Sequence, residues 1–176
     1  MAQTDNSYLA DKVALRLDHL PDEPIKVLDC FGGMGKVWQA VKILSAKNIS
    51  VLPIDIIDYG FHLPGDNKSY LGSMNLEKFN VIDMDAYGIP YEQMKIILDR
   101  KYRGIVFVTF IQSVMGQMSY GLLYDIGFTS EMVKKSPVLF GARGWKYFLE
   151  WLSSYGITEI WHRSHNRKHY LGFELS

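Results

Sequence analysis

The fold is decided by one stretch of sequence, Val27-Leu28-Asp29-Cys30-Phe31-Gly32-Gly33-Met34-Gly35. It joins an apolar run, residues 25–30, to a segment with helical periodicity, residues 37–46. Glycines at such a junction let the backbone approach a ligand closely, and they leave the amides of the helix start facing it. The stretch therefore predicts a strand, a ligand-binding glycine turn and a helix.

Outward from this turn, short runs of branched and apolar residues alternate with helical patterns. We expect strands at 25–30, 49–57, 69–72, 79–84, 105–111, 158–163 and 170–175, and helices at 7–20, 37–46, 91–101 and 139–155. Residues 60–68 are rich in Gly, Pro, Asp and Asn and predict a long loop, and residues 115–132 suit a mobile flap. The order predicts a Rossmann-like, doubly wound α/β fold, with a mainly parallel seven-stranded sheet and a C-terminal antiparallel hairpin.

With 48% apolar and 22% charged residues, the composition is close to the average of globular proteins, and a compact enzyme fits it. We expect one domain over residues 1–176, in which residues 1–24 form an N-terminal helix and lead-in. The sequence contains neither a signal peptide nor an apolar run of about 20 residues, so we expect a cytoplasmic protein without membrane association. The one cysteine, Cys30, excludes an internal disulfide and a thiolate metal cluster within one chain.

Charge is balanced overall but not along the chain. Nineteen basic and nineteen acidic residues cancel, which removes any general attraction for a polyanion. Residues 131–176, however, hold seven basic against four acidic residues and three of the five histidines. We expect Arg163, Arg167 and Lys168 to bind substrate phosphates, with a solvated polar turn as the alternative. A hairpin would spread the histidines, so we expect no metal site there.

An acid lies about twenty residues beyond the glycine turn, at the end of the next predicted strand. Asp55 is placed to accept hydrogen bonds from ribose hydroxyls, which both nicotinamide dinucleotides and S-adenosylmethionine require. Asp58 competes for this role, and we favour Asp55. Trp38 stands where the last glycine of a G-x-G-x-x-G fingerprint would pack, which disfavours a dinucleotide.

The stretch from Val27 to Gly35 resembles the first motif of class I S-adenosylmethionine-dependent methyltransferases, which reads D-x-F-x-G-x-G in many enzymes acting on DNA and RNA. The resemblance implies S-adenosyl-L-methionine as the cofactor. The residues implied to line it are Asp29, Phe31, Gly33 and Gly35. A structural turn with an incidental aspartate is the alternative.

The superfamily often places an acid that contacts adenine after its third strand. Ser73 or Asn75 takes that place in this sequence, and we expect Ser73 to bind the cofactor.

The second informative segment is Phe79-Asn80-Val81-Ile82-Asp83-Met84-Asp85-Ala86-Tyr87-Gly88-Ile89-Pro90. A carboxylate that leaves the fourth strand lies at the sheet edge where ligands bind. We expect Asp85 to orient an acceptor amine and Tyr87 to hold a planar base. In the alternative interpretation, Asp85 caps the following helix.

Residues 79–116 resemble the tRNA dimethylguanosine methyltransferases, whose motif at this place is D-P-F/Y-G-S-P. The resemblance implies transfer of a methyl group to an amine, with Asp85, Tyr87 and Pro90 as catalytic residues. Two positions depart from the motif, because Ala86 replaces proline and Ile89 replaces serine or threonine.

Covalent methylation at C5 of a pyrimidine needs a cysteine nucleophile, and Cys30 lies inside the glycine turn. We therefore expect a methyltransferase that acts on a nitrogen of a base in DNA or RNA, as a homodimer or with a recognition partner. The alternatives are a small-molecule or protein acceptor, or a binding module that transfers nothing.

Overall fold

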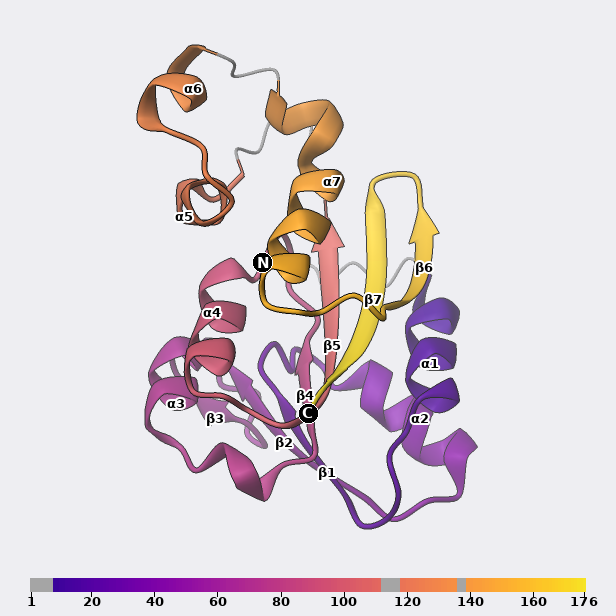
Figure 1. Ribbon diagram of the computed structural model, residues 1–176. Helices are drawn as coiled ribbons and strands as arrows, with labels where there is room; N and C mark the ends of the chain where they lie inside the picture. The colour runs from indigo at the N-terminus through magenta and orange to yellow at the C-terminus, as the bar shows by residue number, and fades with distance from the viewer. Residues whose placement is uncertain (1–7, 112–117, 136–138) are drawn as a thin grey trace.

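The computed structural model describes residues 8–111, 118–135 and 139–176 (Figure 1). The strands are β1 (Ile25–Asp29), β2 (Ile49–Asp55), β3 (Leu63–Pro64), β4 (Val81–Met84), β5 (Gly104–Ile111), β6 (Trp161–His165) and β7 (Lys168–Leu175). The helices are α1 (Leu9–Asp18), α2 (Lys36–Ser45), α3 (Asn67–Ser73), α4 (Tyr91–Asp99), α5 (Tyr120–Asp125), α6 (Ser130–Lys135) and α7 (Leu139–Ser154), with a 3₁₀ turn at Leu76–Lys78.

The strands form a seven-stranded sheet in the order β3-β2-β1-β4-β5-β7-β6. Neighbouring strands are parallel except β7, which runs antiparallel to both β5 and β6. Residues 81–84 and 105–110 are buried without a break, as expected for parallel strands covered on both faces. The predicted fold class, a Rossmann-like mainly parallel sheet with a closing antiparallel hairpin, is confirmed.

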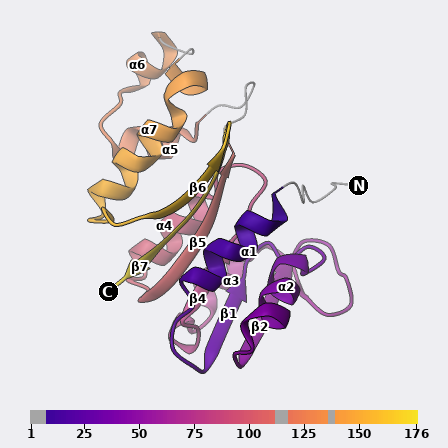
Figure 2. The ribbon, with the colours of Figure 1, turned by 90° about the vertical axis from the view of Figure 1, so that its right-hand side faces the viewer.

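Helices cover both faces of the sheet (Figure 2). On one face, α1 and α2 bury Val13, Leu15, Trp38 and Val41 against β1, β4 and β5. On the other face, α3, α4 and α7 bury a larger cluster that includes Leu71, Met94, Ile97 and Phe148. None of the helices in the described ranges is long and apolar enough to cross a bilayer.

The predicted third strand is wrong. Residues 69–72 belong to α3, which begins after Asp66, whose side chain accepts a hydrogen bond from the Lys68 amide. The third strand is the two-residue β3, inside the predicted loop, where Leu63 and Pro64 pair with Ile54 and Asp55. An N-cap aspartate and a buried Leu71 at helical spacing outweigh the weak strand pattern.

The segment at 115–132, expected to be a flap, contains α5 and the start of α6, and its first three residues lie outside the described ranges.

Several strands end at one edge of the sheet. β1, β2, β4 and β5 run in the same direction, and register places Asp29 between Pro53 and Asp83. Ile111 at the end of β5 pairs with Lys168 at the start of β7. The turn between β6 and β7 therefore lies at the carboxyl edge of the sheet.

Candidate functional site

The glycine turn lies against the end of β2. Gly33 and Gly35 have φ angles of 47° and 67°, in the left-handed region that favours glycine. The Gly32 amide donates to the carbonyl of Ile54 at 3.0 Å. A Cβ atom on Gly32 would lie 2.7 Å from Cβ of Pro53, so a side chain is excluded there. The turn is therefore held by its backbone, in a conformation that only glycine adopts easily.

Asp55 connects β2 to this turn. Its Oδ2 accepts from the Gly33 amide at 2.9 Å, and its Oδ1 accepts from the Ile57 amide at 2.9 Å. Asp58 is exposed and accepts from the Gly60 amide at 2.7 Å, within its own loop. Of the two acids considered for the ribose, the structure places only Asp55 on the glycine turn.

Asp29 is buried below the turn, with 5% of its surface exposed. Its Oδ1 accepts from the Phe31 amide at 3.3 Å. Burial, with the nearby carboxylates of Asp83 and Asp85, raises the pKa of Asp29 well above its ordinary value. The structure thus brings Asp29 and Phe31 together at the turn, with a carboxyl group that favours its neutral form.

The start of α3 also meets the turn. Asn67 is buried and donates from Nδ2 to the carbonyl of Cys30 at 2.8 Å, while its Oδ1 accepts from Gln93 at 2.9 Å. Asp66, the first acid after β3, lies at the same helix start. Neither residue was predicted from the sequence, although Gly65 followed by Asp and Asn is a recognisable helix-start signal.

Ser73 and Asn75 lie elsewhere. Ser73 is exposed at the far end of α3 and donates to the carbonyl of Ser69 at 2.8 Å. Asn75 caps the 3₁₀ turn that follows, where it accepts from the Glu77 amide at 3.0 Å. The structure does not bring them to the glycine turn, because the strand thought to precede them is a helix.

Asp85 is engaged by the first helix. Its two oxygens accept from Nζ of Lys12 at 2.7 and 2.8 Å, and Oδ1 also accepts from Thr109 at 2.5 Å. Nζ of Lys12 lies 5.3 Å from the centre of the Tyr170 ring. The alternative that Asp85 caps α4 is wrong, because Pro90 holds that position without a side-chain cap.

Asp83 carries a second ion pair deeper in the same face. Arg16 donates to it from Nε at 2.7 Å and from Nη2 at 2.6 Å, and Trp38 donates from Nε1 at 2.6 Å. The side chains of Arg16 and Asp83 are each 1% exposed. Helix α1 therefore supplies a cation to each of the two acids of the β4 segment.

The other two residues of the predicted acceptor site, Tyr87 and Pro90, differ in exposure. Tyr87 is 84% exposed, and the carbonyl of Gly88 accepts from the Ile111 amide at 3.0 Å. Pro90 is buried at the start of α4. Only Asp85 of the three predicted catalytic residues has its polar group among other polar side chains.

The basic hairpin is partly neutralised. Arg163 pairs with Asp18 at 2.8 Å and with Asp11 at 3.6 Å, both on α1. Lys168 lies 5.8 Å from the Tyr8 ring, and Arg167 is exposed in the turn. No cluster of three or more potential metal ligands is found among the residues that the structure describes.

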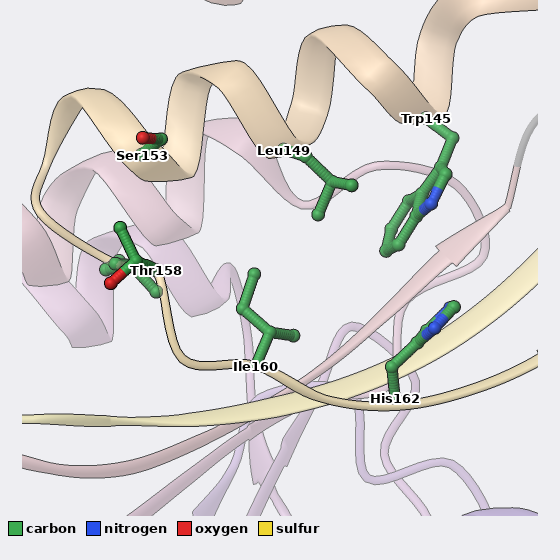
Figure 3. A pocket seen from close by; sticks show the side chains of 7 residues that line it. Trp145, Leu149, Ser153, Thr158, Ile160 and His162 are labelled. Atoms are coloured by element: carbon green, nitrogen blue, oxygen red, sulfur yellow. The ribbon is translucent and has the colours of Figure 1, made fainter.

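A separate pocket of about 400 Å³ lies between α7 and the chain leading into β6, at the opposite end of the sheet from β2 (Figure 3). Trp145 and His162 face each other at one end of it. Trp145 also stacks on His169, with 4.0 Å between ring centres. Burial lowers the pKa of His169 to about 4. The pocket is remote from the glycine turn in strand order.

No protein-family model matches this chain, and no curated protein matches it. Solved structures do match. A Bordetella parapertussis protein described as a "possible exported protein" has a TM-score of 0.57 and 9% identity, over 94% of this chain and 66% of that one. A Clostridium thermocellum "putative rRNA-methylase" has a TM-score of 0.53 and 11% identity, over 94% of each chain.

Phosphoethanolamine N-methyltransferase 2 of Haemonchus contortus, solved with S-adenosyl-L-methionine, has a TM-score of 0.51 and 12% identity, over 88% of this chain and 38% of that one. At these identities the likeness establishes the fold, which this chain shares with S-adenosylmethionine-dependent methyltransferases. The chain spans less than two thirds of the first and third of these proteins.

Proposed function

We propose that this protein is an S-adenosylmethionine-dependent methyltransferase. The observation that carries the proposal is Asp55 bonded to the Gly33 amide, at the carboxyl edge of a sheet with this strand order. A carboxylate and a glycine turn at this edge fit a nucleoside with a charged tail. Phe31, Gly33 and Gly35 would line the donor, with Asp29 beneath them. The shared fold supports the same cofactor.

The adenine contact is reassigned in this proposal. With β3 at Leu63–Pro64, Asp66 takes the position after the third strand that Ser73 was expected to hold. Asp66 precedes Asn67, which bonds to the glycine turn through Cys30. We therefore assign Asp66 rather than Ser73 to the adenine side of the site.

The favoured acceptor is a nitrogen of a base in DNA or RNA. Asp85 lies at the end of β4, where its carboxylate can accept a hydrogen bond from an amine and orient the lone pair. Tyr87 offers an exposed ring for a planar base, and Pro90 is the N-cap residue of α4. An entering acceptor must displace the Lys12 ammonium, which holds both Asp85 oxygens.

For phosphates, exposed Arg167 is the best placed residue, with Lys168 beside it. Arg163 contributes less, because Asp18 and Asp11 already neutralise it. A second protomer or a recognition partner would supply further basic surface, and the cytoplasm remains the proposed compartment.

A small amine is the second candidate acceptor. The observation in its favour is Lys12 itself, since an aliphatic ammonium already sits on Asp85 with the Tyr170 ring nearby. A free amine of similar shape would meet the same carboxylate and ring.

Donor binding is tested by thermal unfolding with S-adenosylhomocysteine and with NAD. A ligand present at 100 times its Kd stabilises the native state by about 2.7 kcal/mol. We expect a clear rise in Tm with S-adenosylhomocysteine alone. Asp55→Ala should lose this shift, and Asp58→Ala is the matched control that should keep it. An equal shift with NAD would contradict the cofactor assignment.

The acceptor is tested with a labelled methyl donor and separate pools of DNA, RNA and small amines. We expect label in nucleic acid, and Asp85→Asn should abolish transfer while donor affinity stays within about twofold. Asp99→Asn, an exposed acid on α4, is the control. Label only in the small amines would favour the second candidate. Label in neither, despite donor binding, would favour a module that binds without transfer.

A further inference from the structure

His62 is a buried side chain whose polar atoms are unpaired. It is 8% exposed, and neither Nδ1 nor Nε2 has a hydrogen-bond partner among the residues that the structure describes. Leaving a buried polar group without a partner is unfavourable, and most such groups in native proteins are paired. His62 therefore needs an explanation that the packing of the chain does not provide.

The position of His62 points to the glycine turn. A Cβ atom on Gly32 would lie 2.8 Å from both Nε2 and Cδ2 of His62, so that edge of the imidazole lies against the turn. Gly33, the next residue, is the one bonded to Asp55. His62 and Asp55 thus meet the same turn at adjacent residues.

The loop that precedes His62, residues 59–61, also lies near the glycine turn. The Phe61 ring lies 3.7 Å from where a Cβ atom of Gly35 would be, and it is 55% exposed. The rings of Tyr59 and Phe61 lie 5.0 and 4.1 Å from the His62 ring. Gly60 between them has a φ of 81° and no neighbour that a side chain would meet. A shift of this segment would uncover the imidazole.

We propose that His62 binds the ribose of the methyl donor, opposite Asp55, and that residues 59–61 move to admit it. An ionised carboxylate only accepts hydrogen bonds, whereas a neutral imidazole donates one and accepts one. A ribose diol offers hydroxyls that do both, so Asp55 takes one hydroxyl and His62 takes the other. This assignment rests on the proposed function, and it adds a recognition residue that no motif marks.

The test is calorimetric titration of S-adenosylhomocysteine into wild type and His62→Phe, with thermal unfolding of each free protein. Phe keeps a flat apolar ring and removes both nitrogens. We expect Kd to rise about tenfold, the scale of one lost hydrogen bond with its unpaired partner. The Tm of the free variant should equal or exceed that of wild type, because the unpaired nitrogens are gone. His19→Phe, a ring stacked on Trp161, is the matched control that should bind as wild type does.

A second measurement covers a variant that packs poorly. In wild type labelled with ¹⁵N in its histidine rings, the His62 resonances should shift on titration with S-adenosylhomocysteine while those of His19 stay. A donor analogue without one ribose hydroxyl should bind wild type about tenfold more weakly and His62→Phe with no further loss. Equal Kd values for wild type and His62→Phe, with unmoved His62 resonances, would overturn the assignment alone. No binding by wild type would overturn the proposed function as well.

Discussion

The two halves of the carboxyl edge of the sheet differ in whether their ionisable groups have partners of opposite charge. On the side proposed to hold the methyl acceptor, Asp83 and Asp85 each pair with a cation from α1. On the side proposed to hold the methyl donor, burial and the carboxylates of Asp83 and Asp85 raise the pKa of Asp29 despite its hydrogen bond from Phe31. The His62 nitrogens have no partner among the described residues. Uncompensated groups lower stability and are retained where function needs them. If the proposed function is correct, the donor side is a site kept ready for its ligand, and the acceptor side is covered by α1.

The greatest loss of stability should come from removing one member of the buried Arg16–Asp83 ion pair. Arg16→Met leaves the Asp83 carboxylate, which is 1% exposed, without its bidentate partner. Removing one member of a buried ion pair destabilises a protein by about 3–5 kcal/mol, and urea unfolding measures the loss. Adding Asp83→Leu to Arg16→Met should recover part of it. Lys95→Met, at an exposed i,i+4 pair, is the control. A decrease in the free energy of unfolding of less than about 1 kcal/mol would contradict this prediction.

A second prediction concerns His169, a histidine that has a hydrogen-bond partner. His169 meets His162 at 3.3 Å, and burial lowers the pKa of His169 to about 4, against about 6.5 in an unfolded chain. Between these values the unfolded chain binds a proton that the folded state excludes, so stability falls as pH drops from 6.5 to 4.

The loss attributable to His169 should reach about 3 kcal/mol at pH 4. His169→Phe, which keeps an aromatic ring against Trp145, should remove that part of the acid sensitivity in urea unfolding followed from pH 7 to pH 4. Parallel pH profiles for the variant and wild type would contradict the prediction.

The third prediction is that a substitution at Asp29 raises stability, whereas one at Arg16 lowers it. Asp29→Asn should stabilise the free protein at pH 7 by about 1 kcal/mol, because the buried carboxyl that Asp83 and Asp85 disfavour is gone. The folded-state pKa of Asp29 is raised, so the variant's advantage should grow as pH rises above about 4. Chemical unfolding at pH 4, 6 and 8 tests this. A destabilised variant at every pH would place Asp29 with the compensated acids.

The smallest effect concerns the hairpin. Arg163 pairs with Asp18 near solvent, and such pairs contribute about 0.2–1 kcal/mol. Arg163→Gln should lower stability by that amount in 50 mM salt and by less in 500 mM salt. It should leave the salt slope of nucleic-acid binding nearly unchanged, whereas Arg167→Gln should reduce that slope by about 0.7–0.9. Equal reductions of the slope in Arg163→Gln and Arg167→Gln would show that Arg163 also binds phosphate.

The sequence predicted the parts of this edge that depend on local pattern. Apolar runs located β1, β2, β4 and β5, and the glycine spacing located the turn with Asp55 beside it. It could not predict that Lys12 meets Asp85 or that Arg16 meets Asp83, because these pairs join residues 73 and 67 positions apart. The third strand was misplaced because β3 has only two residues, Leu63 and Pro64. A strand of two residues shows no alternation of apolar and polar side chains.

The chain order of the sheet has a consequence for biosynthesis. β7, residues 168–175, lies between β5 and β6, and the β6–β7 hairpin holds α1 through Asp11 and His165, which are 154 positions apart. Residues up to about 175 must therefore leave the ribosome before β5 gains its second neighbour. Until then the outer edge of β5 presents unpaired backbone groups, a template for aggregation that chaperones commonly shield during synthesis.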